Sequence, residues 1–301
     1  MTVLGIDVGA GAVKSAVYGA GAVPIARGEQ ETARSYAGLI EQLRGIIAAA
    51  RRDHGVAAAG VGVPGFLSRP AGVIVRSPNM RFLDGAHLER DLAAAAGLPL
   101  RVENDANAAA LGEYLALEGG RPDPFVHLTL GSGIGSGIVA GGTLMRGACG
   151  LAGELGHLLV SPAGRPCGCG NRGCAETESS AAGIVASYRE YAGEGGDLDA
   201  AGVFARRQRG DGAAQKAFDR AGRFLGVLLA QIVYALNPGL VSVGGGVAAA
   251  GEALLKPARE ELARRVVPLA CAATRVEAAR LGNGAGCAGA AALARDAARH
   301  R

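Results

Sequence analysis

The segment VLGIDVGAGAVKSAVY, residues 3–18, sets a layout that the segment FVHLTLGSGIGSGIVA, residues 125–140, repeats. Each has an apolar run, a glycine-rich turn and a second apolar run, a pattern that predicts a strand, a turn and a strand. A dinucleotide-binding fold would instead pass from its first strand into a helix. The repeat is one of motif type, not of close sequence, and it predicts two lobes built alike. The predicted strands cover 3–8, 13–18, 125–130 and 138–140, and the predicted turns cover 9–11 and 131–137.

Strands and helices alternate through the rest of the chain, which favours an α/β architecture. A chain of 301 residues is also longer than one ordinary core. We therefore expect an α/β protein of two lobes. The further predicted elements are helices at 36–54, 88–96, 106–117, 179–191, 213–237 and 285–298, and strands at 58–63, 99–103 and 240–243.

Composition and charge argue against several classes of protein. The net charge is only +4 and the arginines are spread along the chain, which argues against a nucleic-acid partner. The first residues, MTVLGIDVG, lack the charged start and long apolar run of a secretory signal. No apolar run reaches a membrane-spanning length without glycine, proline or charge. We expect a cytoplasmic protein that binds neither membranes nor nucleic acid.

A metal-binding pattern lies in GELGHLLVSPAGRPCGCGNRGCAE, residues 153–176, which contains His157, Cys167, Cys169 and Cys174. One imidazole and three thiolates are the ligand set of a closed, tetrahedral structural zinc site. Three of the six cysteines fall within eight residues, so a chance cluster of reduced thiols is a weaker interpretation. A disulfide is also weak, because Cys-x-Cys makes a poor bridge and cytosolic chains rarely form one.

Three glycine-rich turns follow short apolar strands: DVGAGAVK at 7–14, GSGIGSG at 131–137 and VGGGV at 243–247. Glycine lets backbone N–H groups approach phosphate oxygens, and successive N–H groups form an anion-binding nest. One such turn often only closes a hairpin. Three at strand ends of a two-lobed α/β chain predict a bound nucleoside triphosphate. Neither common nucleotide fingerprint fits, because GSGIGSG leads into a strand and no P-loop Gly-Lys-Ser/Thr occurs.

Asp105, in the segment ENDAN at 103–107, is the candidate general base. It follows a predicted strand at the edge where open α/β sheets bind ligands. Phosphoryl transfer to a hydroxyl needs a positioned proton acceptor and electrostatic stabilisation of the phosphoryl group. Asn104 and Asp105 also precede an alanine-rich helix, so the alternative role is that of an N-cap. Both roles can hold if one residue caps the helix and the other faces the cleft.

Two more carboxylates flank the metal-binding pattern. Glu154 lies three residues before His157, and Glu176 lies two residues after Cys174. Each is a candidate hydrogen-bond acceptor for substrate hydroxyls, held in place by the metal loop. The alternative for each is a solvated acid on the surface.

Together these motifs resemble the ROK family (repressors, open reading frames and kinases) of bacterial sugar kinases, within the hexokinase–actin superfold. The likeness covers nearly the whole chain, and the zinc loop and the ENDAN segment are its most specific parts. The zinc-bearing members of most similar appearance are ATP-dependent glucokinases of actinobacterial type. The matching segments are GIDVG, VGVPGF, SPNM, VENDANAAALGE, LTLGSGIGSGI, GLAGELGHL, CGCGNRGCAE and NPGLVSVGGGV.

The resemblance implies a kinase that transfers the terminal phosphate of Mg-ATP to a hexose hydroxyl, glucose to glucose 6-phosphate being the first expectation. Asp105 would be the base, and His157 would face zinc with one ring nitrogen and the sugar with the other. The implied sugar contacts are Gly65, Asn79, Asn104, Asp105, Glu154, His157 and Glu176. The implied donor contacts are Asp7, Gly9, Ala10, Gly11, Ala12, Lys14, Gly131, Ser132, Gly133 and Gly135, with Gly244, Gly245 and Gly246 near the adenosine.

The resemblance also implies a ribonuclease H-like arrangement of two lobes. The small lobe would cover 1–107 and be joined by the C-terminal helix at about 285–301. The large lobe would cover 108–284 and carry the zinc loop at 157–176. A homodimer or larger homo-oligomer is implied as well.

The chain departs from the family pattern in its phosphate turns. The family usually reads Asp-x-Gly-Gly-Thr followed by Lys or Asn, whereas this chain reads DVGAGA at 7–12. Gly11 and Ala12 therefore lack two side chains that are usual near the transferred phosphate. Ser132 stands where Thr is usual, which is a milder change. We expect weakened donor binding, although Lys14 remains.

Other functions stay open at this stage. The acceptor can be mannose, N-acetylglucosamine, fructose or allose instead of glucose, and the donor can be polyphosphate. A different class is an inactive sugar-binding or regulatory protein of the same family. The family's repressors add an N-terminal helix-turn-helix, whereas here the first kinase strand begins by Val3, which argues against direct DNA contact.

Overall fold

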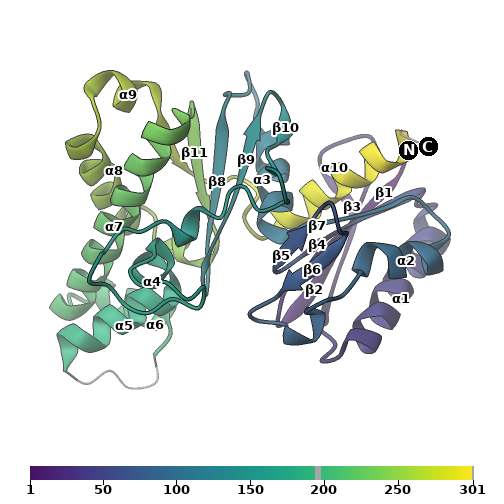
Figure 1. The fold of residues 1–301 in the computed structure, drawn as a ribbon, viewed down its shortest axis with the longest axis horizontal. Coiled ribbons are helices and arrows are strands. Elements are labelled where there is room, and N and C mark those ends of the chain that lie inside the picture. The colour runs from purple at the N-terminus through teal and green to yellow at the C-terminus, as the bar shows by residue number, and fades with distance from the viewer. Residues whose placement is uncertain (194–197, 300–301) are drawn as a thin grey trace.

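The computed structural model describes residues 1–193 and 198–299, and these contain two five-stranded sheets. The sheets lie in two lobes (Figure 1), with the purple and blue N-terminal strands in one and the teal and green strands in the other. The expected two-lobed α/β fold is confirmed.

The first sheet contains, in spatial order, β3 (Pro24–Glu31), β2 (Ala12–Tyr18), β1 (Val3–Val8), β4 (Ala58–Val63) and β7 (Leu100–Asn104). β1 pairs antiparallel with β2 and parallel with β4, and β4 pairs parallel with β7. The sequence pattern does not predict β3, because this strand is mostly exposed and carries charged residues. It forms through pairing with β2 at the edge of the sheet.

The second sheet contains, in spatial order, β10 (Thr143–Leu144), β9 (Ile134–Ala140), β8 (Phe125–Leu130), β11 (Leu240–Gly244) and β12 (Arg275–Ala278). The β8–β9 hairpin repeats the β1–β2 hairpin, and β8 pairs parallel with β11. The duplicated strand–turn–strand layout is therefore present in both sheets. The β10 and β12 strands are short edge strands, which the sequence pattern does not predict.

β9 begins at Ile134 and not at residue 138, so the turn before it covers only 131–133. The glycines of this strand pack against α3 (Asp105–Leu115). A Cβ on Gly135 would lie 2.8 Å from the Cβ of Ala106, and one on Gly137 would lie 2.5 Å from that of Ala110. Part of the expected turn is thus a strand whose glycines admit a closely packed helix.

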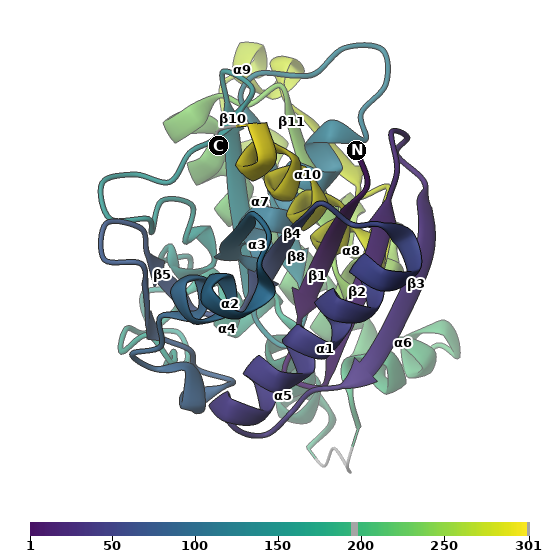
Figure 2. The same cartoon turned by 90° about the vertical axis from the view of Figure 1, so that its right-hand side faces the viewer.

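Two helices connect the sheets. α3 follows β7 directly and packs against β8 and β9, and α10 (Ala285–Arg299) packs against α3, β1 and β4. In Figures 1 and 2, α10 lies beside the first sheet although it ends the chain. The expected C-terminal helix extends to 301, but residues 300–301 lie outside the described residues. The lobe boundaries at 107 and 284 stay predictions.

The remaining helices complete the two lobes. α1 (Tyr36–His54) and α2 (Leu88–Ala96) match the expected bounds, and the leucines of both helices are buried in the core of the first lobe. The expected helix at 179–191 corresponds to α5 (Ala181–Ala192), which the Ser180 side chain caps, and a separate short helix, α4 (Ala175–Ser179), precedes it. α7 (Gly212–Leu236) forms the core of the second lobe with α5 and with α8 (Glu252–Arg265). The other elements are β5 (Phe66–Ser68), β6 (Val73–Arg76), α6 (Ala200–Gln208), α9 (Pro268–Ala273) and the 3₁₀ turns η1 (Arg81–Leu83), η2 (Leu155–His157), η3 (Gly246–Ala250) and η4 (Gly282–Gly284).

Within the described residues, every helix is too short or too polar to cross a lipid bilayer.

Candidate active site

A cleft of about 320 Å³ opens between the two sheets, where β1, β7, β8 and β11 end. The structure brings most of the predicted site residues together around it. Those that line the cleft are Asp7, Lys14, Gly65, Asn79, Asn104, Asp105, Gly131, Ser132, Gly133, Gly135, Glu154, His157, Glu176, Gly244 and Gly245. The predicted site residues outside the lining are Gly9, Ala10, Gly11, Ala12 and Gly246, together with the cysteines Cys167, Cys169 and Cys174.

At the end of β7, Asn104 caps the following helix and Asp105 lines the cleft. The Asn104 side chain is the N-cap of α3: its oxygen accepts from the Asn107 amide at 3.0 Å, and its amide donates to the Gly65 carbonyl at 3.0 Å. Asp105 is the first residue of α3, and its carboxylate accepts from the Ala106 amide at 2.8 Å. Burial raises the pKa of Asp105 above its ordinary value. A carboxylate with a raised pKa is a better proton acceptor, as a general base requires.

Glu103 anchors this strand end from within the protein, and sequence reasoning missed that role. Only 1% of it is exposed, and one carboxylate oxygen lies 2.8 Å from nitrogens of both Arg69 and Arg146. Burial raises the pKa of Glu103, but the two guanidinium groups hold it below its ordinary value. Arg69 follows β5 in the first lobe, and Arg146 follows β10 in the second. Glu103 therefore ties the two lobes together two residues before Asp105.

Three carboxylates meet on the zinc-loop side of the cleft. Burial, together with the nearby charges of Asp105 and Glu176, raises the pKa of Glu154 to about 7. One Glu176 oxygen accepts from the backbone amide of Ile134 at 2.9 Å, which fixes this side chain against β9. Glu154 and Glu176 thus both line the cleft. Crowded acceptors of this kind suit a ligand with several hydroxyl groups.

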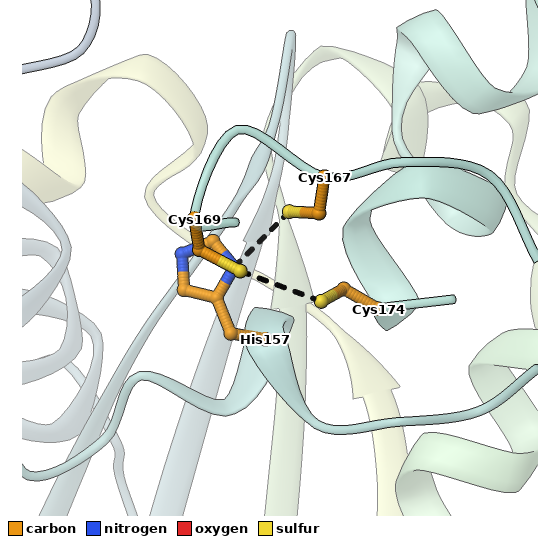
Figure 3. Close-up of side chains that lie close together, drawn as sticks. All are labelled: His157, Cys167, Cys169 and Cys174. Atoms are coloured by element: carbon orange, nitrogen blue, oxygen red, sulfur yellow. Dashed lines mark hydrogen bonds between the residues drawn. The ribbon is translucent and has the colours of Figure 1, made fainter. Parts of the chain in front are cut away.

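The four predicted metal ligands point toward one another (Figure 3). The donor atoms of His157, Cys167, Cys169 and Cys174 all lie within 4.8 Å of one another. Cys167 Sγ is 3.6 Å from His157 Nδ1, and Cys169 Sγ is 3.7 Å from Cys174 Sγ. A tetrahedron with zinc–sulfur bonds of about 2.3 Å has sulfur–sulfur edges of about 3.8 Å. The donor set and its spacing fit zinc.

His157 links this cluster to the cleft through its second ring nitrogen. While Nδ1 faces the thiols, Nε2 lies 4.0 Å from a carboxylate oxygen of Glu154. His157 is the last residue of the 3₁₀ turn η2, and this turn begins directly after Glu154. The opposite end of the loop continues into α4, whose first turn carries Glu176. A filled metal site would therefore fix both carboxylates that flank the loop.

One acidic and one basic residue, Asp7 and Lys14, line the cleft beside the first glycine turn. Asp7 and Lys14 face each other across the β1–β2 pair. Burial and the charge of Asp105 raise the pKa of Asp7 to about 6, although Lys14 opposes the shift. Behind them the turn is closed by a bond from the Gly9 amide to the Ala12 carbonyl at 2.9 Å. The Thr32 hydroxyl donates to the Gly9 carbonyl at 2.6 Å and holds the turn from the end of β3.

The other two turns lie on the second sheet. The Gly131 amide donates to the Gly133 carbonyl at 2.9 Å, which closes the turn between β8 and β9. Gly245 follows β11 with a φ of 84°, a conformation that favours glycine. Three glycine turns thus border one cleft, and the second and third contribute backbone directly to its lining.

The cleft also contains polar residues that the sequence analysis does not single out. His127 and Thr129 line it from β8, and Asn283 lines it from η4. His127 is 2% exposed, and burial lowers its pKa to about 4. The available signal was two polar residues in the otherwise apolar strand FVHLTL. The sequence gives no comparable signal for Asn283, which the fold brings to the cleft from next to α10.

Known proteins are similar to this chain in architecture and in sequence. The profile of the ROK family matches residues 3–297. A glucokinase of Halalkalibacterium halodurans is 37% identical over 243 residues, which cover 76% of this chain and 73% of that protein. The ROK family glucokinase of Streptomyces griseus, solved with glucose and AMPPNP, is 31% identical, with a TM-score of 0.84 over 98% of this chain and 100% of that one. The ROK hexokinase of Thermus thermophilus is 34% identical, with a TM-score of 0.86 and coverage of 100% of both chains.

Proposed function

This chain belongs to the ROK family, and we propose that it transfers the terminal phosphate of ATP to glucose, giving glucose 6-phosphate and ADP. The observation that carries the proposal is the Asp105 carboxylate, held in the cleft between a group of hydroxyl-binding acceptors and the glycine turns. The similarity to glucokinases over most of the chain supports glucose as the acceptor.

In the proposed reaction Asp105 takes the proton of the accepting sugar hydroxyl. The sugar oxygen forms a bond to the terminal phosphorus of ATP, and the bond from that phosphorus to the bridging oxygen breaks. ADP leaves with the electron pair of the broken bond. Because this reaction asks mainly for positioning and charge stabilisation, one base and a well-ordered cleft are sufficient protein machinery.

We assign the sugar to the side of the cleft that carries the zinc loop. Asn104, Glu154 and Glu176 would hold its hydroxyl groups, together with the Nε2 side of His157. Gly65 and Asn79 would complete the pocket from the first lobe. The spacing of these groups around Asp105 supports the assignment, since all of them line the same cleft.

We assign the phosphate donor to the side that carries the glycine turns. Lys14 would neutralise phosphate charge, and the turns at 131–133 and 244–246 would offer backbone N–H groups. Magnesium would be held by the phosphates and by an oxygen ligand such as Asp7, and it would neutralise charge on the transferred group. Gly9 to Ala12 would contribute backbone only, because Gly11 and Ala12 have no polar side chain.

We assign zinc a structural role at His157, Cys167, Cys169 and Cys174, where the donor set fits it. The ion would fold the loop between η2 and α4, and the sugar-side carboxylates Glu154 and Glu176 would be ordered as a consequence. A homo-oligomeric state and a cytoplasmic location stay predictions of the sequence.

A coupled assay of ADP release tests the proposal across a panel of sugars and donors. We expect the highest kcat/KM with glucose and ATP, and lower values with mannose, N-acetylglucosamine, fructose and allose. Polyphosphate in place of ATP tests the donor. Sugar binding without any turnover across the panel would contradict the kinase assignment and favour a regulatory protein.

A further inference from the structure

Three polar side chains form a line of hydrogen bonds across the second sheet. Ser242 Oγ lies 3.3 Å from His127 Nδ1, and His127 Nε2 lies 3.0 Å from Thr129 Oγ1. Ser242 and His127 are buried, whereas Thr129 is partly exposed and lines the cleft. We call this line the Ser–His–Thr chain. It runs from the interior of β11 to the cleft wall at the end of β8.

The position of Thr129 leaves its hydroxyl open toward a ligand. Its partners on the two neighbouring strands are Gly135 on β9 and Gly244 on β11. Neither partner has a side chain that would cover Thr129 on the sheet surface. Among the described residues, His127 is the one hydrogen-bond partner of the Thr129 hydroxyl. The turn at 131–133 begins two residues later, so this hydroxyl faces the donor side of the cleft.

The polarity of the chain follows from what each group can donate. A neutral imidazole has one N–H donor and one acceptor nitrogen. If the Thr129 hydroxyl donates its proton to an anion, its oxygen is free to accept from His127 Nε2–H. His127 Nδ1 then accepts from the Ser242 hydroxyl, and every group of the chain has a partner. Hydrogen bonds aligned in this way strengthen one another.

We propose that Thr129 donates a hydrogen bond to a phosphate oxygen of the nucleotide, and that His127 is the positioning residue that orients its hydroxyl. This inference rests on the proposed kinase function. The Ser–His–Thr chain would supply, from the second sheet, a hydroxyl contact of the kind that Gly11 cannot make from the first sheet.

Two further observations agree with a fixed, neutral imidazole. Burial lowers the pKa of His127 to about 4, so the ring is neutral near neutral pH. A Cβ on Gly244 would lie 2.9 Å from His127 Cε1, so glycine at this position lets the ring lie against β11. The ring is therefore held between two strands with both nitrogens engaged.

The test compares Thr129→Val, which removes the hydroxyl at nearly constant shape, with Thr129→Ser, which keeps it. A hydrogen bond to a charged group corresponds to about a 10-fold or larger change in affinity. We expect Thr129→Val to raise the KM for ATP by about 10-fold or more and to weaken a non-hydrolysable ATP analogue equally in calorimetry. Thr129→Ser should stay close to wild type, and the KM for glucose should not move. Thr143→Val is the matched control, because Thr143 is exposed and bonds only the Ala140 carbonyl.

His127 is tested with Leu, which removes the donor, and with Gln, whose amide can reach the Nε2 position. His127→Leu should reproduce the ATP effect of Thr129→Val, and the double variant should be no worse than either alone, because the two residues act as a unit. His127→Gln should recover part of the affinity. If His127→Leu does not fold, as thermal unfolding would reveal, the Gln variant and Thr129→Val carry the comparison.

Three results would overturn the inference. The first is unchanged ATP affinity in Thr129→Val, and the second is an equal shift in the KM for glucose. The third is that the effects of His127→Leu and Thr129→Val are independent and multiply in the double variant. Failure of the proposed function looks different, since wild type itself would then show no glucose-dependent ADP release. Calorimetry with the ATP analogue would still report on Thr129 in that case.

Discussion

The sugar-side wall of the cleft presents side chains, whereas the donor-side wall presents mostly backbone. The wall to which we assign the sugar consists of Asn104, Asp105, Glu154, His157 and Glu176. The proposed donor-side wall consists of the turns at 131–133 and 244–245, with the Lys14 and Thr129 side chains beside them, and the turn at 9–12 lies outside the lining.

The difference predicts which substitutions each wall tolerates. On the sugar-side wall, burial and the charges of Asp105 and Glu176 raise the pKa of Glu154, and hydrogen bonds from backbone amides hold Asp105 and Glu176 in place. Removing a side chain there removes a functional group. On the donor-side wall most of the proposed functional groups are backbone N–H donors, which every residue except proline has, so harm comes from a Cβ added where the backbone is crowded. Substitutions on each wall test this contrast.

The zinc loop should be the most sensitive part of the sugar-side wall. Structural zinc contributes on the order of 10–16 kcal/mol of apparent binding free energy, more than a glycine-rich loop gains by packing. We expect Cys169→Ser to lose both the metal and the sugar kinase activity, measured by elemental analysis and ADP release. Cys149→Ser is the control, because Cys149 is exposed and outside the cluster. Metal-free protein with full activity would contradict the prediction.

Asp105→Asn should lower kcat while the sugar still binds, since the amide keeps a hydrogen bond but does not accept the proton. Loss of a general base costs about 10²–10⁴-fold. Steady-state kinetics and glucose calorimetry measure the two effects, with the exposed Asp53→Asn as the control. Near-normal turnover would mean that Asp105 only begins α3 and that the base lies elsewhere.

The same residue predicts a pH dependence. The base must be ionised, and burial raises the pKa of Asp105 above its ordinary value. The rate should therefore fall as the pH is lowered through this raised pKa, earlier than it would for an exposed aspartate. The acid limb of the profile of kcat/KM against pH is the measurement, although Asp7 and Glu154 titrate in the same cleft.

On the donor-side wall, two adjacent glycines differ in whether the backbone has room for a Cβ. Gly245 has a φ of 84°, and a Cβ on it would collide with the Leu130 carbonyl, whereas a Cβ on Gly246 would meet nothing within 4 Å. Gly245→Ala should lower the free energy of unfolding by about 1–3 kcal/mol and weaken ATP binding. Gly246→Ala should stay within about 0.5 kcal/mol of wild type. Equal effects in urea denaturation would show that close backbone contact at Gly245 does not matter.

The last expected effect is a gain of donor binding, and it comes from adding side chains to the first turn. A Cβ on Gly11 would meet nothing within 4 Å, so the turn has room for one. Because a hydrogen bond to a charged group is worth about 1.5–3 kcal/mol, Gly11→Thr with Ala12→Lys should lower the KM for ATP by about 10–100-fold. The KM for glucose should barely move. Saturation of the wild type at micromolar ATP, or a shift in the glucose KM instead, would refute the prediction.

Local patterns in the sequence predicted the strand–turn–strand repeats and several helices, because burial of one face imposes a period on nearby residues. The same patterns missed β3 and β12, whose residues are too polar or too few to show a period. They also extended the second turn to residue 137, because β9 contains glycines, which are typical of turns. Only packing against α3 distinguishes the two.

For the site, the amino-acid sequence was enough to predict the cluster of His157, Cys167, Cys169 and Cys174 and the segment that carries Asp105, since both depend on residues close together along the chain. It took the folded protein to show that Asn104 caps α3, that Glu103 joins Arg69 to Arg146, and that His127 meets Ser242. The last pair is separated by 115 positions, and no local period reports such a contact. The spacing of residues that are close in sequence is fixed by the covalent chain, whereas residues far apart in sequence come into contact only after the sheets have formed.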